Sequence, residues 1–143
     1  MKIERIDHIH MKGPDFENTV KALGEIIGRD MYMQMDFTQD EGAEIAYEPY
    51  PIGIELFRVT DPEKTSGSVA DSSPIGPFAI SYKVTDIQEG IRDLEALGYQ
   101  QIKYFDFGPI QEVLFDTKYK LGFYLELIEY KGNSIVEAFE GDA

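Results

Sequence analysis

Two histidines and two glutamates are the residues of this sequence whose types and spacing best suit chemistry. His8 and His10 are the only histidines and stand one residue apart, so they share one face if their segment is a strand. Glu55 and Glu126 each stand between two aliphatic residues, where a buried carboxylate without a partner would be costly. Imidazole nitrogens and carboxylate oxygens together form a ligand set for a divalent metal.

An internal repeat ties these residues to the architecture. Segments around His8 and Glu55 recur 71 positions later, around Ala79 and Glu126, without a net insertion. A constant offset indicates two copies of one supersecondary unit. The repeat matches the two glutamates with each other, but it matches His8 with Ala79, which cannot bind a metal.

Each copy is predicted to run strand–helix–strand–strand–strand, from alternating segments, capping residues and turn signals. The sequence predicts one domain over 1–143: module one at 1–60, a polar linker at 61–76, module two at 77–130 and a tail at 131–143 with a short helix. Predicted strands cover 3–11, 31–37, 43–48 and 53–59 in module one, and 78–84, 101–107, 111–116 and 122–129 in module two. Predicted helices follow Asp15 and Asp86 and end at Gly28 and Gly98. This is an α+β fold in which two βαβββ modules form a curved, cup-shaped mixed sheet with the helices outside.

Composition excludes several classes of function. The chain has 143 residues, no cysteine and a formal net charge of −14. The missing cysteines rule out disulfides, thiolate metal sites and a cysteine nucleophile. The acidity argues against nucleic acid and anionic membrane surfaces as partners, and it disfavours a polyanionic substrate such as a coenzyme A thioester. We find no signal segment or long apolar run, so the expectation is a cytoplasmic protein.

These patterns resemble the vicinal oxygen chelate superfamily, which includes glyoxalase I, methylmalonyl-CoA epimerase, extradiol dioxygenases, fosfomycin-resistance enzymes and bleomycin-binding proteins. The resemblance covers nearly the whole chain and is nearest to the epimerase-like and glyoxalase-like branch. It is carried by Ile6-Asp7-His8-Ile9, Ile54-Glu55-Leu56, Val84-Thr85-Asp86-Ile87 and Leu125-Glu126-Leu127-Ile128-Glu129.

The resemblance implies a metal site on the first and fourth strands of each module. The matching positions are His8, Glu55, Ala79 and Glu126, so the implied ligands are His8, Glu55 and Glu126, with a vacancy at Ala79. His10 lies roughly 6.5–7 Å along the strand from His8 and offers a strained replacement. The epimerase-like branch also implies that Glu44 is a catalytic base. An N/O site of this kind suits Zn, Mn, Ni, Co, Mg or Fe(II).

The expected function is a metal-assisted isomerase, epimerase or lyase acting on a small carbonyl or oxygenated compound. The ion would act as a Lewis acid while a carboxylate removes a proton, with Glu44, Glu126 and His10 as catalytic residues. Two alternatives stay open. One is a metal-free protein that sequesters a cationic ligand, as bleomycin-binding proteins do; the other is a metal-free catalyst with His8 or His10 as base. The resemblance also implies a homodimer.

Overall fold

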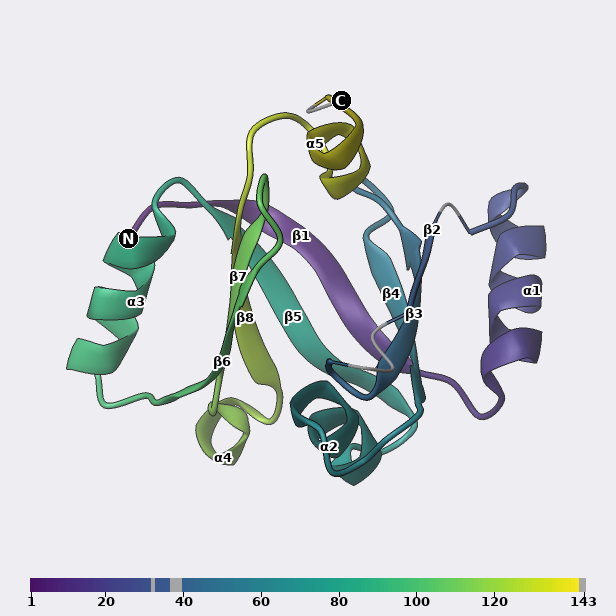
Figure 1. Ribbon diagram of the computed structural model, residues 1–143, viewed down its shortest axis with the longest axis horizontal. Coiled ribbons are helices and arrows are strands. Elements are labelled where there is room, and N and C mark those ends of the chain that lie inside the picture. Colours follow the sequence, from purple (N-terminus) through teal and green to yellow (C-terminus); the bar gives the residue numbers. More distant parts are fainter. Residues whose placement is uncertain (32, 37–39, 142–143) are drawn as a thin grey trace. The chain divides into compact units, whose positions relative to one another are not determined.

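The computed structural model describes residues 1–31, 33–36 and 40–141, and the predicted helices and strands occur in the predicted order (Figure 1). Module one holds one helix and four strands, and so does module two, with three further helices outside the repeated pattern. The elements are β1 (Ile3–Lys12), α1 (Phe16–Ile27), β2 (Met33–Asp36), β3 (Ala43–Glu48), β4 (Ile54–Val59), α2 (Thr65–Ser72), β5 (Gly76–Val84), α3 (Ile87–Ala96), β6 (Gln101–Asp106), β7 (Gln111–Phe115), α4 (Lys118–Leu121), β8 (Tyr124–Glu129) and α5 (Ile135–Gly141).

Strand pairing is the same in the two modules. The strand order is β2-β3-β4-β1 in module one and β6-β7-β8-β5 in module two. In each module the first strand runs parallel to the fourth, and the other pairs are antiparallel. The predicted α+β class with two βαβββ modules is therefore confirmed.

By its contacts the chain divides into two compact units. We call residues 1–8, 49–51 and 79–143 the α3 unit, and residues 9–48 and 52–78 the α1 unit. Strands β1 and β5 each run from one unit into the other, because β1 crosses the boundary after His8 and β5 crosses it before Ala79.

The α1 unit is built on a capped amphipathic helix. Asp15 accepts a hydrogen bond from the backbone N–H of Asn18 at 3.0 Å, and Gly28 ends the helix with a φ of 93°. The apolar side of α1 packs on one face of the module-one sheet, where Leu56 and Ala46 are buried. Since strand residues alternate, Glu55 lies on the opposite face from Leu56.

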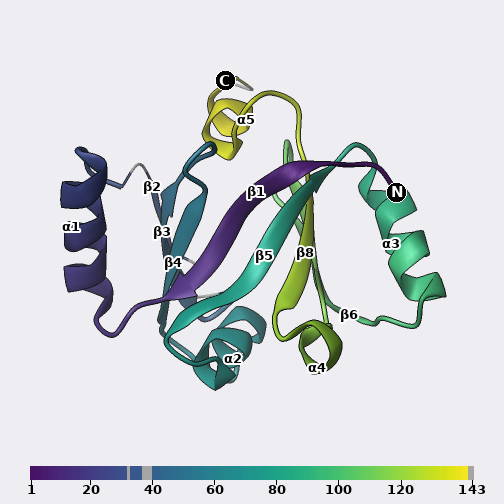
Figure 2. The ribbon, with the colours of Figure 1, turned by 180° about the vertical axis from the view of Figure 1, so that it is seen from behind.

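The α3 unit repeats this plan. Asp86 accepts hydrogen bonds from the N–H groups of Gln88 and Glu89 and so caps α3. The helix covers Phe115 and Leu127, both fully buried. Figure 2 shows α3 beside the module-two strands in the view from behind. Glu126 therefore lies on the face of this sheet that α3 does not cover.

The segment predicted to be a linker contains a helix. α2 spans Thr65–Ser72 and lies against β4. Small residues allow this close packing: Ala70 is fully buried, and a Cβ at Gly67 would come within 2.0 Å of the Asp61 carbonyl oxygen. Small residues give no apolar period, so the sequence pattern missed this helix. It also missed α4, whose four residues are too few to show a helical period.

Two other predicted elements are the tail helix and the second strand of module one. The predicted tail helix is present as α5. Phe37, the last residue of the predicted second strand, lies outside the described residues. No helix in the described part of the chain is long and apolar enough to cross a membrane.

Candidate metal centre

His8 is held by its chain neighbour Asp7. The Nδ1 atom of His8 lies 2.8 Å from Asp7 Oδ2, and both side chains are about 1% exposed. A carboxylate at this distance favours the tautomer with a proton on Nδ1, which leaves Nε2 to bind elsewhere. Strict strand alternation places Asp7 and His8 on opposite faces, so the sequence pattern did not predict this contact.

Ser81 and Glu126 lie at the other side of the His8 ring. His8 Nε2 is 3.1 Å from Ser81 Oγ and 3.7 Å from Glu126 Oε1. The Ser81 hydroxyl donates a hydrogen bond to Glu126, its register partner across β5 and β8. All three side chains are buried. Thus the α3 unit brings together two of the predicted site residues, His8 and Glu126, and adds Ser81, which was not predicted.

Tyr130 and Arg5 complete the surroundings of Asp7. The Tyr130 hydroxyl donates a hydrogen bond to Asp7 Oδ1, and Arg5 lies 2.7 Å from the Tyr130 hydroxyl and 3.6 Å from Asp7. Burial alone would raise the pKa of Asp7, but the hydrogen bonds from His8 and Tyr130 and the charge of Arg5 outweigh it and lower that pKa. Burial and the hydrogen bond to Asp7 raise the pKa of Tyr130. Asp7 is therefore an anion that anchors His8.

His10 has its own carboxylate partner in the α1 unit. Its Nδ1 atom lies 2.8 Å from Glu55 Oε2, and the two residues are register partners across β1 and β4. The His10 ring stacks on Phe57 at 5.5 Å between centroids and meets the edge of Phe78 at 6.0 Å. Glu55, predicted to be a metal ligand, here holds a histidine ring.

The 71-residue offset relates these two pairs. It matches His10 with Ser81 as well as Glu55 with Glu126. In each module the first-strand residue contacts the glutamate opposite it on the fourth strand. The repeat therefore contained a signal for Ser81. Ala79, matched with His8, is buried and offers no ligand atom.

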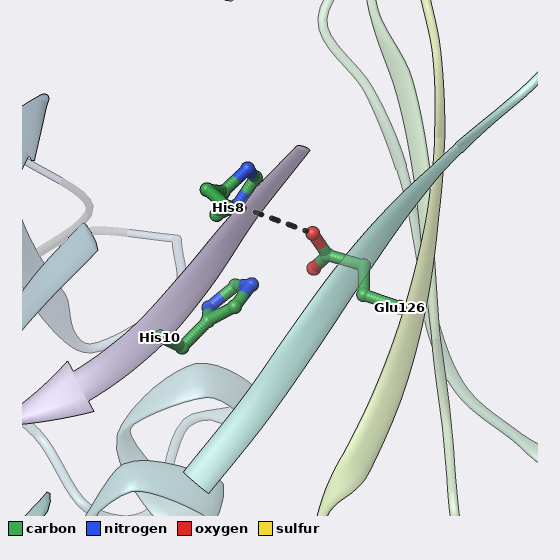
Figure 3. A group of neighbouring side chains, drawn as sticks. All are labelled: His8, His10 and Glu126. Carbon is green, nitrogen blue, oxygen red and sulfur yellow. Dashed lines mark ion pairs between the residues drawn. The ribbon is translucent and has the colours of Figure 1, made fainter. Parts of the chain in front are cut away.

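His8, His10 and Glu126 each offer one ligand atom within 4.8 Å of the others (Figure 3). The two histidines stand one residue apart on the continuous strand β1, and Glu126 faces His8. Ligands about 2.0–2.1 Å from one tetrahedral ion are about 3.3 Å apart, so the 3.7 Å between His8 Nε2 and Glu126 Oε1 nearly suits a shared ion. The three side chains are buried and offer imidazole nitrogen and carboxylate oxygen as ligand atoms, which fits the divalent metals expected from the sequence. A carboxylate also lies at Nδ1 of each histidine ring, as is usual for metal-binding histidines.

Glu44 lies away from this set. It pairs directly with Arg58 across β3 and β4, and its Oε1 accepts a 2.6 Å hydrogen bond from that guanidinium group. Arg58 also binds Glu17 of α1, so Glu44 is on the helix-covered face of the sheet, opposite Glu55. The repeat agrees, because the counterpart of Glu44 is Phe115, which packs under α3. The structure therefore does not bring Glu44, the predicted base, to the face of Glu55 and His10.

The fold has close counterparts among solved structures. A variant of the methylmalonyl-CoA epimerase of Streptomyces coelicolor, in complex with 2-nitronate-propionyl-CoA, aligns with a TM-score of 0.73 at 17% identity over 92% of this chain and 100% of that chain. The chain has the vicinal oxygen chelate fold. A hypothetical protein from Bacillus halodurans matches it with a TM-score of 0.72 at 18% identity over 90% of this chain and 95% of the other. The Mycobacterium tuberculosis methylmalonyl-CoA epimerase aligns with a TM-score of 0.69 at 16% identity over 91% of this chain and 90% of that chain.

The vicinal oxygen chelate fold is thus confirmed by structure rather than by sequence similarity. No protein-family model and no curated protein sequence matches this chain. At identities of 16–18% the likeness establishes the fold, and the chemistry has to be argued from the residues of this chain.

Proposed function

We propose that this protein is a metal-dependent isomerase or epimerase acting on a small oxygenated carbon compound, with His8, His10 and Glu126 as the metal ligands. The observation that carries the proposal is the paired anchoring of the histidines. Asp7 holds Nδ1 of His8 and Glu55 holds Nδ1 of His10, each at 2.8 Å. Carboxylates that fix ring orientation in this way are typical of metal-binding histidines.

This ligand set differs from the one expected at the sequence level. His10 takes the place left vacant by Ala79, and Glu55 changes from ligand to the residue that orients His10. When bound, a divalent ion would supply Lewis-acid stabilisation of negative charge on a substrate oxygen. Three protein ligands leave coordination positions for substrate.

The protein residues supply the rest of the chemistry. Glu55 lies on the same face as His10, and we assign removal of the substrate proton to it in place of Glu44. In this assignment Oε2 keeps its contact with His10 Nδ1, and Oε1 takes the proton. The rings of Phe57 and Phe78 lie 5.4 Å apart beside His10 and exclude water from it. Ser81 keeps Glu126 directed at His8 until the ion is bound.

The proposed substrate is a small compound, and charge supports this restriction. The solved epimerase of Streptomyces coelicolor binds a coenzyme A derivative. A formal net charge of −14 repels a polyanion at long range, so we propose a smaller carbonyl substrate for this chain.

Metal titration and proton exchange test the proposal together. Calorimetry with Zn²⁺ or Mn²⁺ should show about one ion per chain. Binding should be lost in His8→Ala and Glu126→Gln and kept in Glu95→Gln, an exposed residue of α3. With metal present, NMR in D₂O should show exchange of the proton next to a carbonyl in a panel of small oxo acids, and Glu55→Gln should slow it.

The outcomes separate the parts of the proposal. A protein that binds no divalent ion contradicts the metal site. Metal binding without exchange on any substrate contradicts the isomerase chemistry but leaves the metal site intact. Stoichiometric binding of a cationic aromatic ligand by metal-free protein, weakened by salt, would favour sequestration instead.

A further inference from the structure

The α3 unit contains a cavity of about 910 Å³ apart from the candidate metal ligands. Its walls come from the ends of β5 and β8, the β6–β7 turn, the start of β1 and helix α5. This volume lies in the range of small-molecule binding sites. Pro109, Ala138 and the Tyr130 ring give it apolar surface.

A buried lysine is the main polar group of this cavity. Lys83 is only 7% exposed. Its ammonium group lies 3.0 Å from Glu4 Oε2, 3.2 Å from the Gly132 carbonyl oxygen and 4.5 Å from the centre of the Tyr130 ring. Burying an ammonium group is costly unless it is paired, so Lys83 needs one carboxylate beside it.

The carboxylate that now fills this position comes from an exposed side chain. Glu4 is 37% exposed and lies at the cavity wall, and the hydrogen bond from Lys83 lowers its pKa. An exposed partner loses little when water replaces its contacts. The Glu4 carboxylate therefore marks where the carboxylate of a ligand would bind.

The other acidic groups of the wall have partners of their own. Glu129 accepts a 2.9 Å hydrogen bond from the N–H of Ile87, and Glu137 accepts one of 3.0 Å from the N–H of Asn133. Lys131 adds a second positive charge to the lining. An incoming carboxylate that takes the place of Glu4 keeps one negative group against the Lys83 ammonium, while the displaced Glu4 side chain, 37% exposed, turns to water.

We propose that this cavity binds a small carboxylate with an apolar body, whose carboxylate replaces Glu4 on Lys83. The cavity shares Tyr130 with the surroundings of the candidate metal centre, because the ring lines the cavity and the hydroxyl donates to Asp7. Binding of a carboxylate to Lys83 does not require the proposed function. Glu4 competes with the ligand for Lys83. Removing the Glu4 charge should therefore strengthen ligand binding, and removing the Lys83 charge should abolish it.

Benzoate, with its neutral analogue benzamide, is a suitable probe. NMR titration of the metal-free protein should give saturable shifts at Gly132 and Tyr130 with benzoate and none with benzamide. Glu4→Gln should bind benzoate about tenfold more tightly, because the competitor is gone. Lys83→Met should abolish binding, while Lys21→Gln on α1 should leave it unchanged.

Three results would overturn the proposal. One is an absence of saturable binding to both the wild type and Glu4→Gln. Another is an affinity of Glu4→Gln for benzoate equal to or below that of the wild type, which would show that the ion pair between Lys83 and Glu4 has only a structural role. The third is equal binding of benzamide, which would show that Lys83 does not recognise the charge. Glu4→Gln changes an exposed side chain, so the test stands even if Lys83→Met does not fold.

Discussion

Asp7→Asn is the most informative single substitution, since Asp7 determines which nitrogen of His8 carries a proton. Asp7 is 1% exposed and accepts hydrogen bonds from His8 Nδ1 and from the Tyr130 hydroxyl. An asparagine has only one accepting oxygen in place of two. If its NH₂ group turns toward His8, Nδ1 must accept, and the proton moves to Nε2, where it blocks the metal.

The expected loss follows from this geometry. Removal of an outer partner of a metal ligand weakens binding about 10–100-fold, or about 1.4–2.7 kcal/mol. The loss of hydrogen bonds to a buried charge should lower the free energy of unfolding by about 1–3 kcal/mol. Metal affinity should therefore be measured by calorimetry at a temperature where the variant is fully folded.

The assay has a control and a direct readout of the mechanism. Asp71→Asn removes an exposed carboxylate on α2 and should change neither quantity. Nitrogen-15 NMR of the histidine rings reports the tautomer. We expect Nδ1–H for His8 in the wild type and Nε2–H in Asp7→Asn. An unchanged tautomer together with wild-type metal affinity would refute the role of Asp7.

Three further predictions concern Asp7 and pH, Glu44, and the buried ring of Phe115. Because the pKa of Asp7 is lowered on folding, its contribution to stability is complete above the unfolded value near 3.8 and is lost as the pH falls through the folded pKa. Acid unfolding should therefore be less steep in Asp7→Asn, and an identical pH dependence of the two proteins would contradict a lowered pKa of Asp7. Glu44→Gln should leave metal binding unchanged and cost at most about 1 kcal/mol, because its pair with the 38% exposed Arg58 is screened by water; a large loss of metal affinity, measured by calorimetry, would instead place Glu44 in the site. Phe115→Ala should lower the free energy of unfolding in denaturant by about 3–5 kcal/mol, since the ring is fully buried under α3; a loss below about 1 kcal/mol would contradict that packing.

Much of the fold could be predicted because the repeat and the alternation of apolar residues report burial directly. The 71-residue offset defined both modules, and Asp15 and Asp86 marked the starts of the two main helices. Helix α2 was not predicted because its packing depends on the small residues Gly67 and Ala70, and such residues give the sequence no amphipathic period.

The site was predicted less completely because its contacts are tertiary. His8 and Glu126, both predicted to be metal ligands, lie 3.7 Å apart, whereas strand alternation placed Asp7 on the other face from His8. Ser81 was overlooked although the same offset matches it with His10. The match of Glu44 with Phe115 indicated a helix-covered position, and comparing the faces in both modules would have shown it.

We propose above all that His8, His10 and Glu126 bind one divalent metal ion. Its most direct test is a crystal structure of Zn²⁺-soaked protein with anomalous data collected at the zinc edge. If these three side chains bind zinc, one strong peak will lie about 2.0–2.2 Å from a nitrogen of each histidine and from an oxygen of Glu126. A structure at saturating zinc with no peak among these three side chains would contradict it.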